Sequence, residues 1–365
     1  MTGVEAFRPG ADDAAVLALR AAVWGADHPH ADPAFLGWLL GPDNPAGPGG
    51  GVIVRRGGRA VGFAGLCPRL ARLDGRDVRI AHGLEYMVDP ALGGGLAGRL
   101  ALRVAAGWAA AAREQGFAFG INYPNENSRR ILTSARLGWR PTLSPRLMAR
   151  ALSGFGAMEQ PTGALVRLAA RLGLSLAALA QGGRAALARR PGAGAALTLD
   201  PAAPRDARMI DALWRRVADM RRVGLRRDAA ALGWRYAAHP LRRYAILGWA
   251  VEDNLKALIV TTERALHGLR CLMIVDALID PSAPEAVRAL IAGAAAGAAR
   301  GGGALALAEA APGCDLARAL AAAGFVATPR RLDPKPFMLV TLPLGEAAAF
   351  APADWRFAWG DMDVA

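Results

Sequence analysis

The chain has 365 residues, a formal net charge of +13 at pH 7 and 53% hydrophobic residues. This length predicts two domains of ordinary size, and the lack of any apolar run of about 18 residues excludes a membrane-spanning helix. The first residues lack a basic start and an apolar stretch, and the three cysteines (Cys67, Cys271 and Cys314) lack metal-site spacing. We therefore expect a soluble, cytoplasmic protein without disulfides or a bound metal.

The positive charge fits nucleic acid, an anionic membrane surface or a phosphate-bearing small molecule as partner. A biased genome composition explains it equally well. Aromatic residues do not alternate with the arginines as they do in base-stacking surfaces, and no nucleic-acid-binding motif is present. We therefore expect no nucleic-acid partner.

The first 150 residues combine helices with antiparallel strands. In chain order the pattern predicts helices at 12–23 and 35–40, hairpin strands within 51–88 that turn at 56–58 and 74–75, a helix at 96–113, a strand at 117–122 and a helix at 126–136. This order is an α+β arrangement with one β-α-β crossover.

The pattern of residues 151–205 predicts that this segment is a helical connector and linker. Its arginine-bearing helix at 163–190 either joins two domains or contacts a membrane surface. Residues 206–365 then repeat the first outline, with a helix at 209–220, strands at 243–251, 257–262 and 271–279, a helix at 284–300, a strand at 304–308 and a helix that ends near 323–325. An internal duplication is therefore expected.

A run of glycines separates the strand that ends near residue 88 from the next helix. Gly93, Gly94, Gly95 and Gly98, with small Ala97, let the backbone approach a ligand without side-chain clash. A helix N-terminus offers unpaired N–H groups and about half a positive charge. The turn therefore indicates a phosphate-binding cradle.

Gly95-Leu96-Ala97, the segment GINYPNENS and the closure Leu137–Trp139 together resemble the GNAT superfamily of acyl-CoA-dependent N-acyltransferases. The resemblance extends over nearly the whole chain and implies two tandem GNAT-like domains (1–150 and 206–365), each a mixed, mostly antiparallel sheet flanked by helices, with the second copy degenerate. The chain is similar in particular to the tandem branch of this superfamily, which acylates amino sugars and precursors of polysaccharides or secondary metabolites. Leu92, or Gly93 if the turn is aligned without a gap, stands where the family has Arg or Gln, which predicts weakened or altered CoA affinity and not its loss.

The resemblance implies acetyl-CoA or another acyl-CoA as co-substrate, and it implies no metal. The residues that it places on this ligand are Met87, Val88, Gly93, Gly94, Gly95, Leu96, Ala97, Gly98, Arg99, Asn122 and Asn127. Asn125 is expected to cap the following helix instead. A second CoA site is not expected, because residues 280–286 contain prolines and no glycine turn.

Three residues are candidates for proton transfer. Glu85 lies on the strand that leads into the glycine turn, where a carboxylate base is common in the superfamily; a structural ion pair with an arginine is the alternative. Ser134 takes the place of the family's general-acid tyrosine. Asp361, in a tail with two tryptophans, either binds or deprotonates the amine or belongs to a capping strand. His82 is expected to be a hydrogen-bonded framework residue.

The second half is expected to complete the acceptor pocket. Its candidate lining is Trp234, Arg235, Tyr236, His239 and Tyr244, for which ordinary packing is the alternative. Asp276 equally fits a buried strand carboxylate that needs a partner. The arginines at 215, 216, 221, 222, 226 and 227 indicate a solvated helix face or a contact with acceptor phosphate.

These features predict an N-acyltransferase that moves an acyl group from a CoA thioester to a primary amine of a small molecule by direct attack. Two alternatives remain open. One is a non-catalytic GNAT-fold binding protein, and the other is a Fem-like transferase that uses aminoacyl-tRNA.

Overall fold

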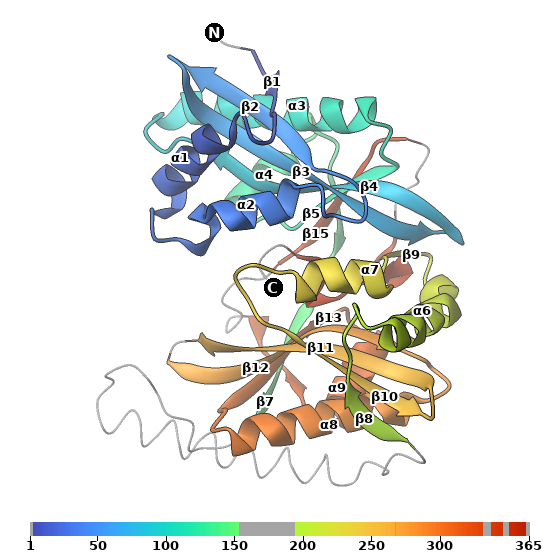
Figure 1. Cartoon of the computed structure of the whole chain (residues 1–365). Coiled ribbons are helices and arrows are strands. Elements are labelled where there is room, and N and C mark those ends of the chain that lie inside the picture. Colours follow the sequence, from blue (N-terminus) through green and yellow to red (C-terminus); the bar gives the residue numbers. More distant parts are fainter. Residues whose placement is uncertain (1–2, 153–193, 267, 331–336, 346–349, 363–365) are drawn as a thin grey trace, which may run out of the picture.

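The computed structural model describes residues 3–152, 194–266, 268–330, 337–345 and 350–362. They form an α+β structure with two mixed, mostly antiparallel sheets, one above the other in Figure 1, each flanked by helices. The predicted connector helix at 163–190, with its membrane contact, lies outside these residues. Within the described ranges, no helix has the length and apolar character needed to cross a bilayer.

The first sheet carries the predicted hairpins and is covered by helices on both faces. Its order is β1 (Glu5–Ala6), β2 (Gly50–Arg56), β3 (Arg59–Leu73), β4 (Arg76–Val88), β5 (Phe119–Asn122), β15 (Leu339–Pro343) and β6 (Arg140–Leu143). The short strands β9 (Val223–Leu225) and β16 (Trp355–Arg356) extend it along β3. The predicted turns at 56–58 and 74–75 are confirmed.

Alternation along the strands sends successive side chains to opposite faces of this sheet. One face packs on α3 (Gly94–Glu114) through Val104 and Trp108. The other face packs on α1 (Asp13–Trp24) and α2 (Pro33–Leu40) through Phe63 and Met87. The 3-10 turn η1 (Pro29–Ala31) connects α1 to α2, and α4 (Glu126–Leu132) follows β5 and ends four residues before the prediction.

The second sheet repeats the order of the first. It runs β8 (Ala195–Thr198), β10 (Ala245–Val251), β11 (Asn254–Leu266), β12 (Leu269–Ile279), β13 (Leu305–Ala310), β7 (Arg146–Ala151) and β14 (Val326–Ala327). The helical elements of this half are α6 (Pro204–Val217), η2 (Ala218–Met220), α7 (Ala229–Leu232), the π-helical turn η3 (Gly233–Ala237), α8 (Pro284–Arg300), α9 (Asp315–Ala322), η5 (Pro352–Asp354) and η6 (Trp359–Asp361). Helices α8 and α6 cover opposite faces.

The two halves exchange a strand. β7, which follows the first half in the sequence, pairs with β13 and β14 in the second sheet. β15, which comes from the second half, pairs with β5 and β6 in the first sheet. Figure 1 shows green β7 in the lower sheet and red β15 in the upper one. The predicted boundary at residue 150 thus falls within a strand that belongs to the second sheet.

Candidate functional site

The parting of β4 and β5 opens the cleft on which the site is built. These parallel strands pair only at Ala81 with Gly120 and at His82 with Ile121. Beyond this point they diverge, and a cavity of about 460 Å³ lies between the end of β4 and the segment that follows β5. Its lining combines residues from β4, from the start of α4 and from the α1–α2 connection: Trp24, His28, His30, His82, Gly83, Leu84, Glu85, Tyr86, Asn122, Tyr123, Pro124, Asn125, Glu126, Ser128, Arg129 and Phe337.

Glu85 enters this cavity from a β-bulge in β4. The register against β3 shifts between Phe63 and Gly65, so two residues of β4 face one residue of β3. Glu85 takes a left-handed φ of 54°, a conformation that non-glycine residues seldom adopt outside functional or strongly constrained positions. The bulge turns a charged side chain inward from a strand that is otherwise apolar there.

The Glu85 side chain is 1% exposed and has two cationic or ionisable neighbours. Its Oε2 lies 2.8 Å from Nε of Arg20 in α1, and its Oε1 lies 3.0 Å from Nδ1 of His30. The ion pair with an arginine, which was the alternative interpretation of Glu85, is therefore present, and the residue also lines the cavity. Because the imidazole and the carboxylate are in direct contact, a proton can pass between them.

The histidines that approach Glu85 were not predicted from the sequence. His28 and His30 lie in the segment DHPHADP, which holds two of the chain's five histidines. Their ring centroids are 5.0 Å apart, and each packs against Trp24. Two histidines around a proline in a connecting segment were the signal that could have indicated this side of the site.

Polar groups of β4 and β5 complete the cavity wall. The Asn122 amide donates a 2.5 Å hydrogen bond to the Gly83 carbonyl and so bridges the two strands where they begin to part. The Tyr123 hydroxyl is buried and has no hydrogen-bond partner among the described residues. Burial raises the Tyr123 pKa well above its usual value, so the hydroxyl keeps its proton at neutral pH.

His82 supports this wall as a neutral ring. Burial, helped by the positive charges of Arg69 and Arg235, lowers the His82 pKa well below its usual value. Its ring packs edge-on against Tyr123 at 5.7 Å. The predicted hydrogen bonds of His82 are absent at Nδ1, which has no partner among the described residues.

The glycine turn lies at the start of α3, beyond the end of β4. Gly93 is the N-cap of α3, and Gly94 has a φ of 34°. A Cβ added at Gly93, Gly94, Gly95 or Gly98 would meet no atom within 4 Å. Packing therefore does not require these glycines, and the main-chain N–H groups of the exposed Gly94 and Gly95 at the start of α3 are open to an anion.

Tyr86 connects the glycine turn to the cavity. Its side chain lines the cavity, and its hydroxyl donates a 2.5 Å hydrogen bond to the Ala101 carbonyl in α3. The other residues predicted to contact the cofactor lie between the end of β4 and the first turns of α3. The Met87 side chain is buried in the core, Val88 and Ala97 are partly buried, and Leu96 and Arg99 are exposed on α3.

Two further predicted residues lie around α4, outside the lining of the cavity. Asn127 is exposed in the first turn of α4, between the lining residues Glu126 and Ser128. The Ser134 hydroxyl is buried beyond the end of α4 and has no partner among the described residues. Asn125 caps α4 by accepting the Ser128 N–H at 2.9 Å, as predicted.

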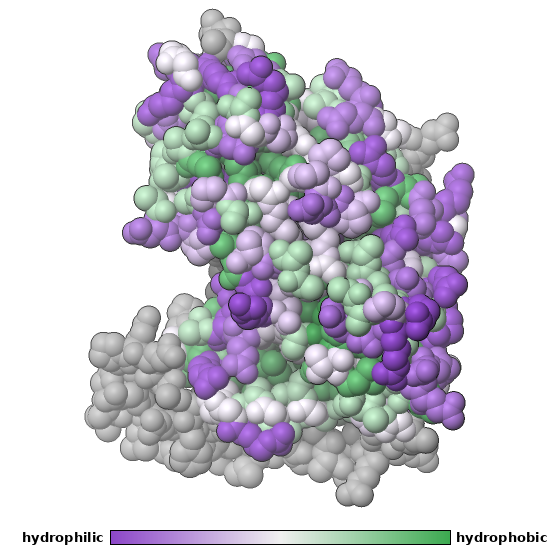
Figure 2. Space-filling model, in the orientation of Figure 1, coloured by the Kyte–Doolittle hydropathy of each residue, from purple (hydrophilic) through white to green (hydrophobic). Residues whose placement is uncertain are grey.

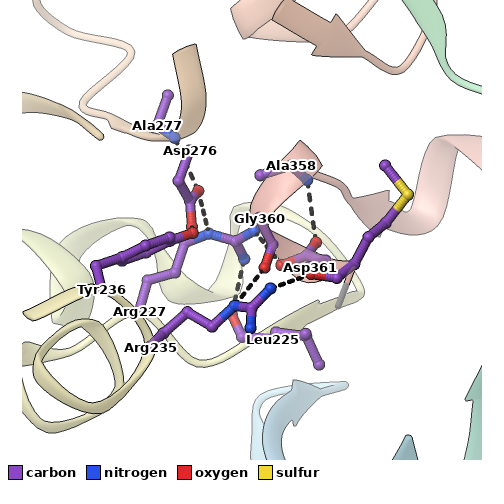
Figure 3. Close-up of polar contacts among 10 residues, drawn as sticks. Leu225, Arg227, Arg235, Tyr236, Asp276, Ala277, Ala358, Gly360 and Asp361 are labelled. Carbon is purple, nitrogen blue, oxygen red and sulfur yellow. Dashed lines mark hydrogen bonds and ion pairs between the residues drawn. The ribbon is translucent and has the colours of Figure 1, made fainter. Parts of the chain in front are cut away.

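Asp361 lies in a separate buried network (Figure 3). Arg227 donates to Asp361 and to Asp276, each at 2.7 Å, and Asp276 also accepts the Tyr236 hydroxyl at 2.7 Å. Burial raises the Asp361 pKa, while the nearby Arg227 charge opposes this shift. Asp276 is thus a buried strand carboxylate with a partner. The expectation of a solvated arginine face is wrong for Arg227, which is 2% exposed.

Four of the five residues predicted to line the acceptor pocket, all but Tyr244, are buried at the junction of the two halves. Trp234 stacks on Trp38 at 5.0 Å, and Arg235 donates to the Gly360 carbonyl at 2.9 Å. Neither lines the 460 Å³ cavity. Tyr236 and His239 border another cavity of about 330 Å³, formed mainly by residues 240–244.

Stability should depend on pH through His239. Burial, together with the charges of Arg235 and Arg242, lowers its pKa to about 3. As the pH falls, His239 is therefore protonated in the unfolded state before it is protonated in the folded state. The stability that the neutral ring contributes is complete above about pH 6.5 and is lost as the pH falls toward 3.

The free energy of unfolding should fall between pH 7.5 and pH 5.5 in the wild type. We expect this fall to be about 1 kcal/mol smaller in His239→Asn, as measured by urea denaturation. In the wild type, His239 Nδ1 accepts a hydrogen bond from the Leu241 N–H at 3.2 Å, and the side-chain oxygen of asparagine can accept the same bond. An unchanged pH dependence would show that His239 is not held neutral.

No protein-family model matches the chain, and no curated protein does. Several solved structures, however, are similar to this chain in fold. A GCN5-related N-acetyltransferase from Anabaena variabilis aligns with a TM-score of 0.62 at 10% identity, over 94% of this chain and 73% of its own. A probable N-acyltransferase from Enterococcus faecalis aligns with a TM-score of 0.61 at 11% identity, over 94% and 73%.

A third similar structure is the N-myristoyltransferase of Saccharomyces cerevisiae, solved with bound myristoyl-CoA and inhibitors. It aligns with a TM-score of 0.59 at 11% identity, over 94% of this chain and 80% of its own. Identities this low establish a common fold and nothing finer. The chain therefore has the α+β fold of the GCN5-related N-acyltransferases, as the sequence predicted.

Proposed function

We propose that the protein transfers an acyl group from acyl-CoA to a primary amine of a small molecule, such as an amino sugar or a metabolite precursor. One observation carries the proposal: the buried Glu85 carboxylate enters the cleft between the parted strands β4 and β5, whose end leads to the open glycine turn. The fold neighbours, which are named as N-acetyl-, N-acyl- and N-myristoyltransferases, support the same reaction type. Tandem-branch membership and a cytoplasmic location remain parts of this proposal.

In the proposed complex, the CoA diphosphate binds the N–H groups of residues 93–95 at the start of α3, and the acyl-pantetheine arm extends along β4. Main-chain N–H groups near Met87 and Val88 hold the thioester carbonyl. The amine nitrogen attacks this carbonyl, so the C–N bond forms and the C–S bond breaks. No covalent bond to the enzyme is needed.

Two protons must move during this reaction. Glu85 accepts the amine proton, either directly or through His30, which lies 3.0 Å from it. The departing thiolate needs a proton, and Tyr123 is a protonated hydroxyl on the cavity wall. We assign donation to Tyr123 in preference to Ser134, whose residue does not line the cavity. Asp361, paired with Arg227, takes a structural role.

Titration calorimetry with acetyl-CoA and longer acyl-CoAs, followed by thiol release in the presence of amines, tests the proposal. We expect acyl-CoA binding and amine-dependent release of free CoA. Absence of any acyl-CoA binding would contradict the proposal. Binding without turnover on any amine would favour the non-catalytic protein, and tRNA binding without CoA affinity would favour the Fem-like transferase.

A substitution in the glycine turn provides a sharper test of the diphosphate position. Gly95→Glu should raise the Kd for CoA about tenfold or more, because it places a carboxylate beside the phosphates. Glutamate is favourable in the first turn of a helix, so the fold should tolerate it. Gly95→Ala is the matched control and should change the Kd by less than about threefold. Equal Kd values for both variants would place the diphosphate elsewhere.

A further inference from the structure

A small cavity of about 170 Å³ lies where the two halves of the chain meet. The first half contributes Asn44, which follows α2, and Arg69 of β3. The second half contributes Arg226 and Asp228, which precede α7, and Trp234 of η3. Figure 1 shows α7 below α2, and Figure 2 shows the two halves joined across the middle of the same face. A ligand in this cavity therefore contacts both halves at once.

Arg69 brings a buried guanidinium group to this cavity. The residue is 9% exposed, and its guanidinium lies over the ring of Trp234, 5.2 Å from the ring centre. Both residues line the cavity. Within the described ranges, no acceptor lies within hydrogen-bond distance of the Arg69 side chain and no carboxylate lies within ion-pair distance of it. The N–H donors of this guanidinium are thus available to a ligand.

The other polar side chains of the lining already have partners. Asn44 donates to the Pro68 carbonyl at 2.8 Å, and its side-chain oxygen accepts a main-chain N–H at 3.0 Å. Arg226 pairs with Asp228, which also accepts the Ala231 N–H at 2.9 Å. Because the charges of Arg226 and Asp228 balance each other, the positive charge of Arg69 is the net charge of the lining.

The surroundings disfavour this charge. Burial, and next the positive charge of Arg235, lower the Arg69 pKa. Asp361 acts in the opposite direction, but its carboxylate accepts from Arg227 at 2.7 Å and makes no ion pair with Arg69. An arginine in a protein keeps its proton, so the group remains charged where water has little access. A bound anion would offset this cost.

We propose that this cavity binds a small oxyanion, phosphate or carboxylate, on the guanidinium of Arg69. Paired N–H donors in one plane match two oxygens of either anion, so both share this recognition chemistry. The volume corresponds to roughly five water molecules of the liquid, which suits inorganic phosphate or a short carboxylate. Pro45 and Ala230 line the cavity and are exposed, so a ligand can enter from solvent.

This site is independent of the proposed function. None of its lining residues lines the cleft of Glu85, and the glycine turn is not part of it. The expected effect of the anion is stabilisation of the folded chain, because a ligand that binds only the folded state raises the Tm.

Calorimetric titration with inorganic phosphate and with acetate, at ionic strength matched with chloride, tests the site. We expect at least one oxyanion to bind, and its Kd to rise about tenfold or more in Arg69→Gln. Binding of phosphate alone or of acetate alone identifies which oxyanion the site takes. Arg79→Gln is the matched control, since the Arg79 guanidinium also lies over an aromatic ring, that of Phe117, but the residue is exposed. It should bind normally.

A second variant supplies a carboxylate from the chain itself. Ala230→Glu places an acidic side chain at the mouth of the cavity, in the first turn of α7, where glutamate is favourable. We expect the Kd for the added oxyanion to rise about tenfold or more, because the new carboxylate competes for Arg69. Ala230→Gln has the same size without the charge, and its Kd should stay within about threefold of the wild type.

Several outcomes would overturn the site. They are no binding of either oxyanion to the wild-type protein, equal heat from chloride, and normal binding by Arg69→Gln or by Ala230→Glu. Loss of phosphate binding in Gly95→Glu alone would place the anion at the glycine turn instead. Arg69→Gln should bind acyl-CoA normally, so this site and the proposed function can fail separately. Circular dichroism of each variant checks that it is folded.

Discussion

Replacement of Arg227 by methionine is expected to lower the free energy of unfolding by about 3–5 kcal/mol. Arg227 is the cation that links Asp276 in β12 to Asp361 near the end of the described chain (Figure 3). All three side chains are almost fully buried. Methionine fills most of the volume but leaves two buried carboxylates without their ion-pair partner, which is more costly than the ion pair was favourable. Urea denaturation at neutral pH measures the difference.

Arg226→Met provides the matched control for this variant. Arg226 is the preceding residue, pairs with Asp228 and Asp77, and is about one third exposed. Solvent reaches the Arg226 guanidinium although its partner Asp228 is buried, so the control should lose clearly less unfolding free energy than Arg227→Met. Similar losses in both variants would contradict a special role of the buried network.

Glu85→Gln should lower kcat by about 100-fold or more while the Kd for acyl-CoA stays near normal. Glutamine keeps the size and the acceptor oxygen of Glu85 but cannot take up a proton at neutral pH. The glycine turn that is proposed to bind the diphosphate is not part of this contact with Arg20 and His30. Steady-state kinetics and calorimetry on the same preparation separate the two effects.

A second carboxylate beyond the end of β4 controls for the charge change. Asp89 is also buried, pairs with Arg59 at 2.6 Å and accepts the Ala91 N–H. Asp89→Asn keeps the acceptor oxygen, and we expect kcat to remain within about threefold of the wild type. Normal turnover in Glu85→Gln would remove Glu85 from the reaction.

Local sequence signals predicted most helices and hairpins. Gly57 and Gly58, and the pair Asp74-Gly75, specify tight turns between strands, and all have the positive φ that such turns need. Helix α8 begins and ends at the predicted residues, because Pro284 starts it and Gly301 follows it. Helix α4 is shorter than its pattern, since Thr133 closes it by donating to the Arg129 carbonyl.

The site could be predicted only in part. Glu85 and Asn122 were recognised because they flank a strand end, and both line the cleft. Arg20 and His30 approach Glu85 from sequence distances of 65 and 55 residues, and no local pattern encodes such a contact. The bulge that turns Glu85 inward depends on the register with β3, which two strands set together. The pairing partners of β7 and β15 are non-local for the same reason.

The exchange of β7 and β15 has a practical consequence for anyone who divides this chain. A fragment that stops at residue 152 retains β7 but lacks the sheet that β7 joins, and it exposes the edge of β5 that β15 covers. Uncovered strand edges recruit other chains, so each severed piece should aggregate instead of folding. We consequently expect the two halves to unfold as one unit, so that a ligand bound to either half raises the Tm of both.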